Sequence, residues 1–224
     1  KVNYFLERFF IKILIMEKAT IGKDLEICRI LNGMWQVAGG HGQIDSKLAI
    51  QDMQKYQESG FTTWDLADIY GPAESLIGDF SKKVEQNFQA FTKFVPNPGP
   101  MSNSIVTYYI DESLKKMNVD CIDLLQFHWW DYQDSNYLEA LQHLAKLQED
   151  GKIRYLGLTN FDTKRIKIII EKGFKIISNQ IQYSILDQRP EKIMIPFFMK
   201  HGIKIITYGT LLGGFFSEKY LNVD

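Results

Sequence analysis

Short apolar runs alternate with longer amphipathic segments along this chain from Ile30 onward. The longer segments repeat apolar residues at intervals of three and four, which is typical of helices with one buried face. Such faces comprise Ala49, Met53 and Tyr56; Val106, Tyr109, Ile110, Ser113, Leu114 and Met117; and Tyr137, Leu141 and Leu144. The short runs predict strands over Ile30–Val37, Thr62–Ala67, Ala90–Val95, Asp123–His128, Ile153–Thr159, Ser178–Gln182 and Lys204–Tyr208.

Glycine, proline and aspartate residues mark the ends of these elements. Gly60 and Gly151 follow predicted helices, where a glycine readily takes the left-handed conformation that ends a helix. Asp162 is a good N-cap, and Pro190 suits a first helical turn. Pro196 falls inside a predicted helix, which should therefore kink or begin late.

Strands that alternate with helices, without a linker or a shift in composition, predict one parallel α/β domain. A doubly wound dinucleotide-binding fold should carry a G-x-G-x-x-G fingerprint after its first strand. The segment Ala38-Gly39-Gly40-His41-Gly42 lacks that spacing. The sequence therefore favours an α/β fold of the (β/α)₈ TIM barrel type.

Composition removes several classes of function. The 224 residues carry 26 basic and 27 acidic side chains, a net charge of -1, which offers no attraction for nucleic acid or an anionic membrane. The two cysteines, Cys28 and Cys121, have no C-x-x-C spacing, which argues against a disulfide framework and fits a reducing, cytoplasmic compartment. The four histidines form no H-x-x-x-H pair, so no metal site is expected.

Residues 1–16, KVNYFLERFFIKILIM, stand apart from this pattern. The apolar run from Phe9 to Ile15 is interrupted by Lys12 and is too short to span a bilayer. We expect residues 1–16 to form an extension outside a barrel domain of residues 17–224. A helix lying on a membrane surface is the alternative.

The segment Phe61–Gly71, FTTWDLADIYG, combines a strand with titratable side chains. Asp65 lies near the end of that strand and Tyr70 follows it, while Lys93 and His128 end the next two strands. In a parallel barrel the carboxyl ends of all strands open on one face, so these four side chains should meet. Taken singly, Lys93 could be a surface lysine and His128 a core histidine. Asp68 is expected to serve structure.

Together the four residues suit proton donation by a phenol. A nearby ammonium favours a phenolate, so Lys93 should lower the pKa of Tyr70 and ease proton transfer. Asp65 would hold the lysine charged and oriented, and His128 would donate a hydrogen bond to a substrate oxygen.

The runs DLADIYGPAE, QFHWWDY, LTNFDT and QYSILDQRP resemble those of the aldo-keto reductases over nearly all of Ile30–Leu221. This resemblance implies a barrel that reduces aldehyde or ketone carbonyls with a nicotinamide cofactor, NADP by the family's usual preference, with NAD possible. It assigns the family's catalytic tetrad to Asp65, Tyr70, Lys93 and His128.

The resemblance also implies a cofactor site. It assigns cofactor binding to Thr159, Asn160, Gln180, Tyr208 and Trp35, and to Gly209, Thr210, Leu211 and Gly213 of the following loop. The walls for a small-molecule carbonyl substrate would be Trp35, Trp129 and Trp130, and Trp64 is expected near the site. Independently, Asn and Gln amides near strand ends suit an amide ligand, although loop caps and core hydrogen bonds would also explain them.

The sequence departs from the family after the seventh strand, because it stops at Asp224. The eighth strand–helix unit, which in the family carries a basic segment for the adenosine 2′-phosphate, does not follow. A C-terminally truncated barrel with two exposed strand edges is therefore expected. Two alternatives to an active reductase stay open, a cofactor-sensing regulatory subunit and an inactive truncated product. The oligomeric state is left open.

Overall fold

The computed structural model describes residues 16–39, 42, 44–85 and 87–220. The expected N-terminal extension thus lies, apart from Met16, outside the described residues. Among the helices that are described, none is both long and apolar enough to cross a membrane.

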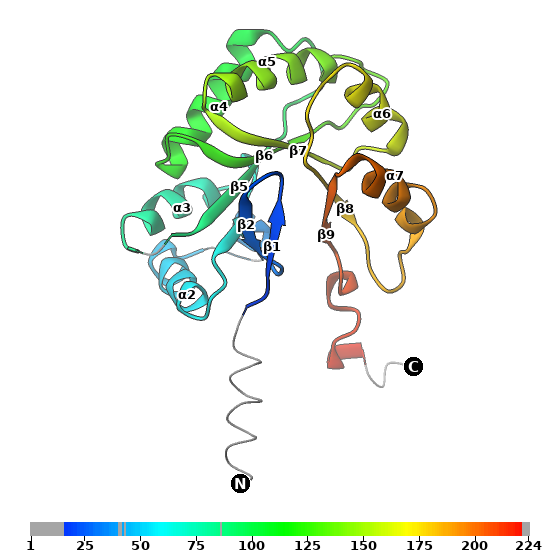
Figure 1. Cartoon of the computed structure of the whole chain (residues 1–224). Coiled ribbons are helices and arrows are strands. Elements are labelled where there is room, and N and C mark those ends of the chain that lie inside the picture. Colours follow the sequence, from blue (N-terminus) through cyan, green and yellow to red (C-terminus); the bar gives the residue numbers. More distant parts are fainter. Residues whose placement is uncertain (1–15, 40–41, 43, 86, 221–224) are drawn as a thin grey trace.

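A parallel sheet of seven strands forms the centre of the fold. Its spatial order equals its order along the chain, β3 to β9, and each strand pairs in parallel with the next. The strands are β3 (Asn32–Gly33), β4 (Thr63–Asp65), β5 (Gln89–Phe94), β6 (Ile122–His128), β7 (Ile153–Thr159), β8 (Ser178–Gln182) and β9 (Lys204–Tyr208). The sheet curls into a half-barrel (Figure 1).

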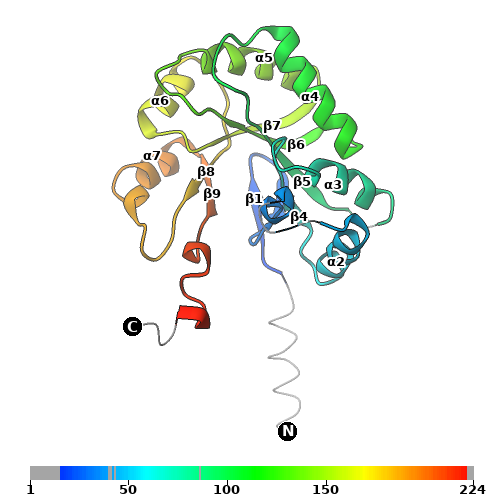
Figure 2. The same ribbon diagram turned by 180° about the vertical axis from the view of Figure 1, so that it is seen from behind.

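Helices follow the strands and lie on the convex side of the sheet in both views (Figures 1 and 2). They are α2 (Ser46–Glu58), α3 (Ala73–Ser81), α4 (Asn103–Met117), α5 (Tyr137–Glu149), α6 (Thr163–Glu171) and α7 (Met194–His201). Short 3₁₀ turns are η1 (Trp35–Ala38), η2 (Arg189–Glu191), η3 (Leu212–Gly214) and η4 (Glu218–Tyr220). A doubly wound sheet would carry helices on both faces, so the barrel-type prediction is confirmed for this incomplete barrel.

The predicted element ends agree with the structure at several points. Asp162 caps α6 by accepting a hydrogen bond from the backbone nitrogen of Arg165, 2.8 Å away. Pro190 lies in the first turn of η2. Pro196 is the third residue of α7, so this helix begins late, which was one of the two expected effects of the proline. Gly60 and Gly151 follow α2 and α5 with φ of 89° and 80°.

The first predicted strand, Ile30–Val37, is wrong over most of its length. The sheet holds only Asn32 and Gly33 of this segment, and the next residue makes one more bond, from the Met34 nitrogen to the Asp65 oxygen at 2.9 Å. The chain then turns into η1, so Trp35 lies in this turn and not in the sheet. Apolar residues in a tight turn give the same pattern as a short strand.

A hairpin that the sequence reading did not predict closes one end of the half-barrel. Strands β1 (Lys18–Ile21) and β2 (Leu25–Cys28) pair antiparallel and lie inside the curve of the sheet (Figure 1). One buried apolar cluster joins the hairpin to the sheet. The hairpin contributes Ile21, Leu25 and Ile27, and the sheet contributes Phe91, Leu124 and Ile206. Burial of these side chains supplies the stabilisation that an isolated hairpin lacks.

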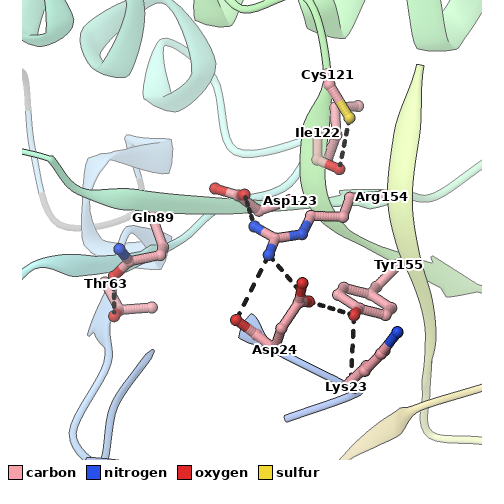
Figure 3. A network of polar contacts seen from close by, with 9 residues as sticks. All are labelled: Lys23, Asp24, Thr63, Gln89, Cys121, Ile122, Asp123, Arg154 and Tyr155. Atoms are coloured by element: carbon pink, nitrogen blue, oxygen red, sulfur yellow. Dashed lines mark hydrogen bonds and ion pairs between the residues drawn. The ribbon is translucent and has the colours of Figure 1, made fainter. Parts of the chain in front are cut away.

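Polar contacts fix the turn of this hairpin to the start of β7 (Figure 3). The Tyr155 hydroxyl donates to the Asp24 carboxylate at 2.6 Å, and the Arg154 guanidinium bridges Asp24, at 3.0 Å, and Asp123, at 3.4 Å. Gly22 takes φ of 60° against the Tyr155 ring, where a Cβ would lie 2.8 Å from a ring carbon. The hairpin therefore closes the end of the half-barrel opposite the C-terminal strand ends.

Candidate active site

The C-terminal ends of three neighbouring strands carry the predicted catalytic side chains. Asp65 is the last residue of β4 and His128 the last of β6, and Lys93 is next to last in β5. Tyr70 lies in the turn between β4 and α3. Because the strands are parallel and in sequence order, their ends share one rim.

Asp65 and Lys93 form a buried ion pair at this rim. Lys93 Nζ lies 2.7 Å from Asp65 Oδ2 and donates a second hydrogen bond to the Leu66 carbonyl at 2.9 Å. Only 2% of the lysine side chain and 14% of the aspartate side chain are exposed. A buried ammonium needs such partners, because an unpaired charge away from water is costly.

Gln126 is a residue of this cluster that the sequence reading missed. Its side-chain nitrogen donates to Asp65 Oδ1 at 2.6 Å, so each carboxylate oxygen of Asp65 has one partner. Residues two apart on a strand share a face. The step from Gln126 to His128 was therefore a signal that could have found it.

Tyr70 lies beside this ion pair, and Lys93 Nζ is 5.1 Å from the centroid of its ring. Burial raises the pKa of Tyr70 to about 12, and the charge of Asp65 adds to the rise. The pKa is therefore not lowered as expected, because desolvation of the phenol and the negative charge of Asp65 raise it. The phenol therefore keeps its proton at neutral pH.

His128 is held neutral at the same rim. Burial lowers its pKa to about 4, and the positive charge of Lys93 acts in the same direction. Its ring lies 4.3 Å from that of Trp130, centroid to centroid. A neutral imidazole can donate one hydrogen bond, so His128 can orient an acceptor oxygen without protonating it.

The turn that carries Tyr70 is tied to β5 by polar contacts on both sides. Asp68 donates its backbone N–H to the Lys93 carbonyl at 3.1 Å, and its carboxylate accepts from the Val95 nitrogen at 3.1 Å. Glu74, in the first turn of α3, accepts a hydrogen bond from the Thr92 hydroxyl at 2.7 Å. The expected structural role of Asp68 thus has a geometric basis.

Candidate cofactor residues continue around the rim on β7, β8 and β9. Thr159 pairs in register with His128 on one side and with Gln180 on the other. Its buried hydroxyl oxygen has no hydrogen-bond partner within the described residues. The Asn160 side-chain oxygen accepts a hydrogen bond from the Tyr208 hydroxyl at 3.0 Å, so these two candidates are brought together.

The loop after β9 contains the remaining cofactor candidates, Gly209, Thr210, Leu211 and Gly213. Gly209 and Gly213 have φ of 66° and 64°, which a glycine adopts without strain. The loop turns through a hydrogen bond from the Leu212 nitrogen to the Gly209 oxygen at 2.9 Å. It follows the end of β9, on the rim that also carries Tyr208.

The four tryptophans do not share one environment. Trp35 is 54% exposed and its ring meets that of Tyr70 at 5.1 Å, while Trp130 is 58% exposed beside His128. Trp129 was expected to be a substrate wall, and this is wrong: it is fully buried in the core between sheet and helices, and its indole nitrogen donates to the carbonyls of Asp131 and Asp134. Trp64 is also buried, under α2 and α3. A side chain that follows a strand can face either the open rim at the C-terminal strand ends or the helices, and the sequence alone did not say which.

Solved structures and curated proteins resemble most of this chain. The aldo-keto reductase AKR11C1 from Bacillus halodurans, in its holo form, superimposes with a TM-score of 0.77 at 27% identity, covering 91% of this chain and 69% of that one. A thermostable aldo-keto reductase bound to the inhibitor epalrestat gives a TM-score of 0.80 at 26% identity, covering 91% and 76%. These likenesses agree with an incomplete (β/α)₈ barrel.

Two curated relatives show the range of matches. The NADH-specific methylglyoxal reductase of Escherichia coli is 26% identical, covering 89% of this chain and 68% of its own length. The aldo-keto reductase str7 of Strobilurus tenacellus is 31% identical, covering 74% of this chain and 51% of its own. The chain thus spans about half to two thirds of the length of these two proteins. Since the sequence profile described as the aldo/keto reductase family matches residues 29–223, the chain belongs to the aldo/keto reductase family.

Proposed function

We propose that this protein reduces aldehyde or ketone carbonyls to alcohols with a nicotinamide nucleotide, and that Tyr70 is the general acid. One observation carries the proposal. The phenol of Tyr70 lies beside a buried ammonium that is itself held by a carboxylate, with a neutral imidazole on the next strand.

The proton step follows from the electrostatics of these groups. A phenol with a pKa of about 12 keeps its proton until a strongly basic oxygen forms beside it. The Tyr70 hydroxyl then gives its proton to the former carbonyl oxygen. Lys93, 5.1 Å from the ring centroid, stabilises the resulting phenolate, and Asp65 keeps the ammonium in place.

Substrate orientation is assigned to His128 and the two exposed tryptophans. The neutral imidazole donates a hydrogen bond to the carbonyl oxygen, which places that oxygen near the Tyr70 hydroxyl. Trp35 contacts the Tyr70 ring and Trp130 contacts the His128 ring, so both supply apolar walls for the substrate.

The residues at β7 to β9 fit a nicotinamide carboxamide. The Thr159 hydroxyl has no hydrogen-bond partner in the described part of the chain. Together with the amides of Asn160 and Gln180 it offers the donors and acceptors that an amide requires. Tyr208, 40% exposed, offers an aromatic face, and Gly209 to Gly213 offer backbone N–H groups for the pyrophosphate. When bound, the nucleotide supplies the hydride that reduces the carbonyl carbon.

NADP is proposed as the cofactor from the family's usual preference, and NAD is the alternative. The name of the Escherichia coli relative, an NADH-specific methylglyoxal reductase, supports testing both nucleotides and including methylglyoxal among the substrates. We further propose that residues 17–224 make up the barrel domain and that residues 1–16 lie outside it.

The test compares the wild-type chain with Tyr70→Phe. Nucleotide oxidation is followed with methylglyoxal and an aromatic aldehyde, and binding of NADPH and NADH is followed by quenching of tryptophan fluorescence. We expect turnover to fall by at least about 100-fold, as loss of a general acid predicts, while the Kd for the nucleotide stays within about twofold. The quenching should come from the exposed Trp35 and Trp130.

Tyr56→Phe is the matched control, because the Tyr56 ring is exposed on α2, away from the rim. It should leave both turnover and binding unchanged. Equal turnover in Tyr70→Phe and wild type would refute the assignment of the acid. A folded wild-type chain that binds neither nucleotide would refute the proposed function.

A further inference from the structure

Asn160 has a backbone conformation that few residues other than glycine adopt. It follows β7 directly, and its φ is 61°. Asparagine tolerates the left-handed region better than most residues, yet the conformation still has to be held by its surroundings. The contacts that hold it therefore decide where its side chain points.

Three hydrogen bonds converge on this one residue. Its backbone nitrogen donates to the Gln180 carbonyl at 2.8 Å, which continues the pairing of β7 with β8. Its backbone carbonyl accepts from the Tyr132 hydroxyl at 2.9 Å. Its side-chain oxygen accepts from the Tyr208 hydroxyl at 3.0 Å.

Two of these contacts use the backbone of Asn160, and the third uses its side chain. An amide ligand at the Asn160 side chain would share the side-chain oxygen with Tyr208 or displace the Tyr208 hydroxyl from it, since that oxygen has two lone pairs. The bond to the Gln180 carbonyl and the bond from the Tyr132 hydroxyl involve the Asn160 backbone, so a ligand at the side chain does not compete for them. Of the two backbone contacts, the one from Tyr132 comes from outside the sheet, since Tyr132 lies in the loop after β6.

Tyr132 is itself held firmly in the loop after β6. The Arg165 guanidinium carbon lies 4.6 Å from the centroid of its ring, and Arg165 Nη2 donates to the Tyr132 carbonyl at 2.9 Å. Arg165 is paired with Asp162, the N-cap of α6. The Tyr132 ring also meets the ring of the buried Phe161 edge-on at 5.2 Å. The hydroxyl is thus presented by a rigid support.

We propose that Tyr132 is a positioning residue, which holds Asn160 in its left-handed conformation and so aims the Asn160 amide at the nucleotide. The role rests on the proposed function, since it concerns binding of the nucleotide. It assigns no part of the chemical step to Tyr132.

Tyr132→Phe removes the hydroxyl and keeps the ring that packs on Phe161 and Arg165. We expect the Kd for NADPH or NADH to rise about fivefold, as loss of one neutral hydrogen bond implies. The kcat at saturating nucleotide should stay within about twofold of wild type, since the Tyr70 cluster is untouched. A purely structural residue would not separate these two constants in this way.

The control is Tyr108→Phe, because Tyr108 is exposed on α4 and its hydroxyl has no hydrogen-bond partner among the residues that the structure describes. This variant should bind the nucleotide as wild type does. An unchanged Kd in Tyr132→Phe, with wild type binding normally, overturns the inference.

A second measurement does not depend on the nucleotide. Amide hydrogen exchange of Asn160 should become at least about threefold faster in unliganded Tyr132→Phe, while amides in the middle of β7 keep the wild-type rate. An unchanged rate at Asn160 overturns the inference even if the wild-type chain binds no nucleotide. A wild-type chain that binds no nucleotide would count against the proposed function, whereas an unchanged exchange rate at Asn160 would count against the role of Tyr132. The two failures are therefore distinct.

Discussion

Asp68 provides the sharpest quantitative test of the site's electrostatics. Its carboxylate accepts one hydrogen bond, from the Val95 nitrogen, and its buried Oδ1 has no partner within the described residues. Burial raises the pKa of Asp68 to about 6 from 3.8, and the charge of Glu74 adds to the rise. Lys116, 3.7 Å from Glu74, opposes it only in part.

The sign and size of the effect on stability follow from this pKa. A carboxyl with a raised pKa in the folded state stabilises the fold when protonated, below pH 3.8, and that stabilisation is lost as the pH rises through about 6. The full difference, about two pKa units, corresponds to about 3 kcal/mol. Between pH 8 and pH 5 the group should add about 1 kcal/mol to the free energy of unfolding.

The perturbation is Asp68→Asn, in which the amide oxygen can still accept from Val95 but cannot titrate. Urea unfolding of wild type and variant at pH 8 and pH 5 gives two stability differences. We expect the wild type to gain about 1 kcal/mol relative to the variant as the pH falls. Taking the difference removes the contributions of all other titrating groups.

Asp79→Asn on α3 is the control, since the Asp79 side chain is 58% exposed and pairs with the exposed Lys82. Its stability difference from wild type should be the same at both pH values. If Asp68→Asn behaves in this way too, Asp68 is not desolvated in the folded protein, and the reasoning fails.

Two further substitutions test the packing around the site. Lys93→Met leaves Asp65 without its ammonium and should reduce the free energy of unfolding by about 3 to 5 kcal/mol. Adding Asp65→Asn to this variant should restore part of the loss. If urea unfolding shows that the two losses add, Asp65 and Lys93 do not form a buried pair. Gly78→Ala places a Cβ 2.1 Å from the Lys116 carbonyl, so the backbones of α3 and α4 must separate. It should lower the free energy of unfolding by about 1 to 3 kcal/mol, whereas Gly33→Ala, which meets nothing within 4 Å, should change it little; equal stability of the two variants would show that α3 and α4 do not approach this closely.

The fold was largely readable from the sequence where the signal is local. Three strands, Ile153–Thr159, Ser178–Gln182 and Lys204–Tyr208, have the predicted bounds. Ile153–Thr159 and Lys204–Tyr208 contain the β-branched and aromatic residues that favour strands, whereas Ser178–Gln182 is mostly polar and has one β-branched residue, Ile181. The segment at Ile30–Val37 failed because a short apolar run fits a 3₁₀ turn as well as a strand, and the turn at Trp35–Ala38 has no buried residue.

The hairpin at Lys18–Cys28 shows a different limit. Its strands have four residues each, and its stability comes from contact with side chains more than 60 positions away, such as Phe91 and Leu124. Local propensity carries no record of such contacts. The same holds for Tyr132, whose hydroxyl meets a carbonyl 28 residues further along the chain.

By itself, the sequence determined the order of strands and helices, the parallel sheet and the placing of Asp65, Lys93 and His128 at three successive strand ends. These follow from periodicity and chain order, because parallel strands joined by helices bring all their carboxyl ends to one rim. Only the tertiary structure decided the state of those groups. Burial keeps the proton on Tyr70 and keeps His128 neutral, and the choice between mouth and core placed Trp129 under the helices and left Trp130 exposed. Desolvation and side-chain direction depend on neighbours from distant parts of the chain, and these are set only when the whole sheet has curled.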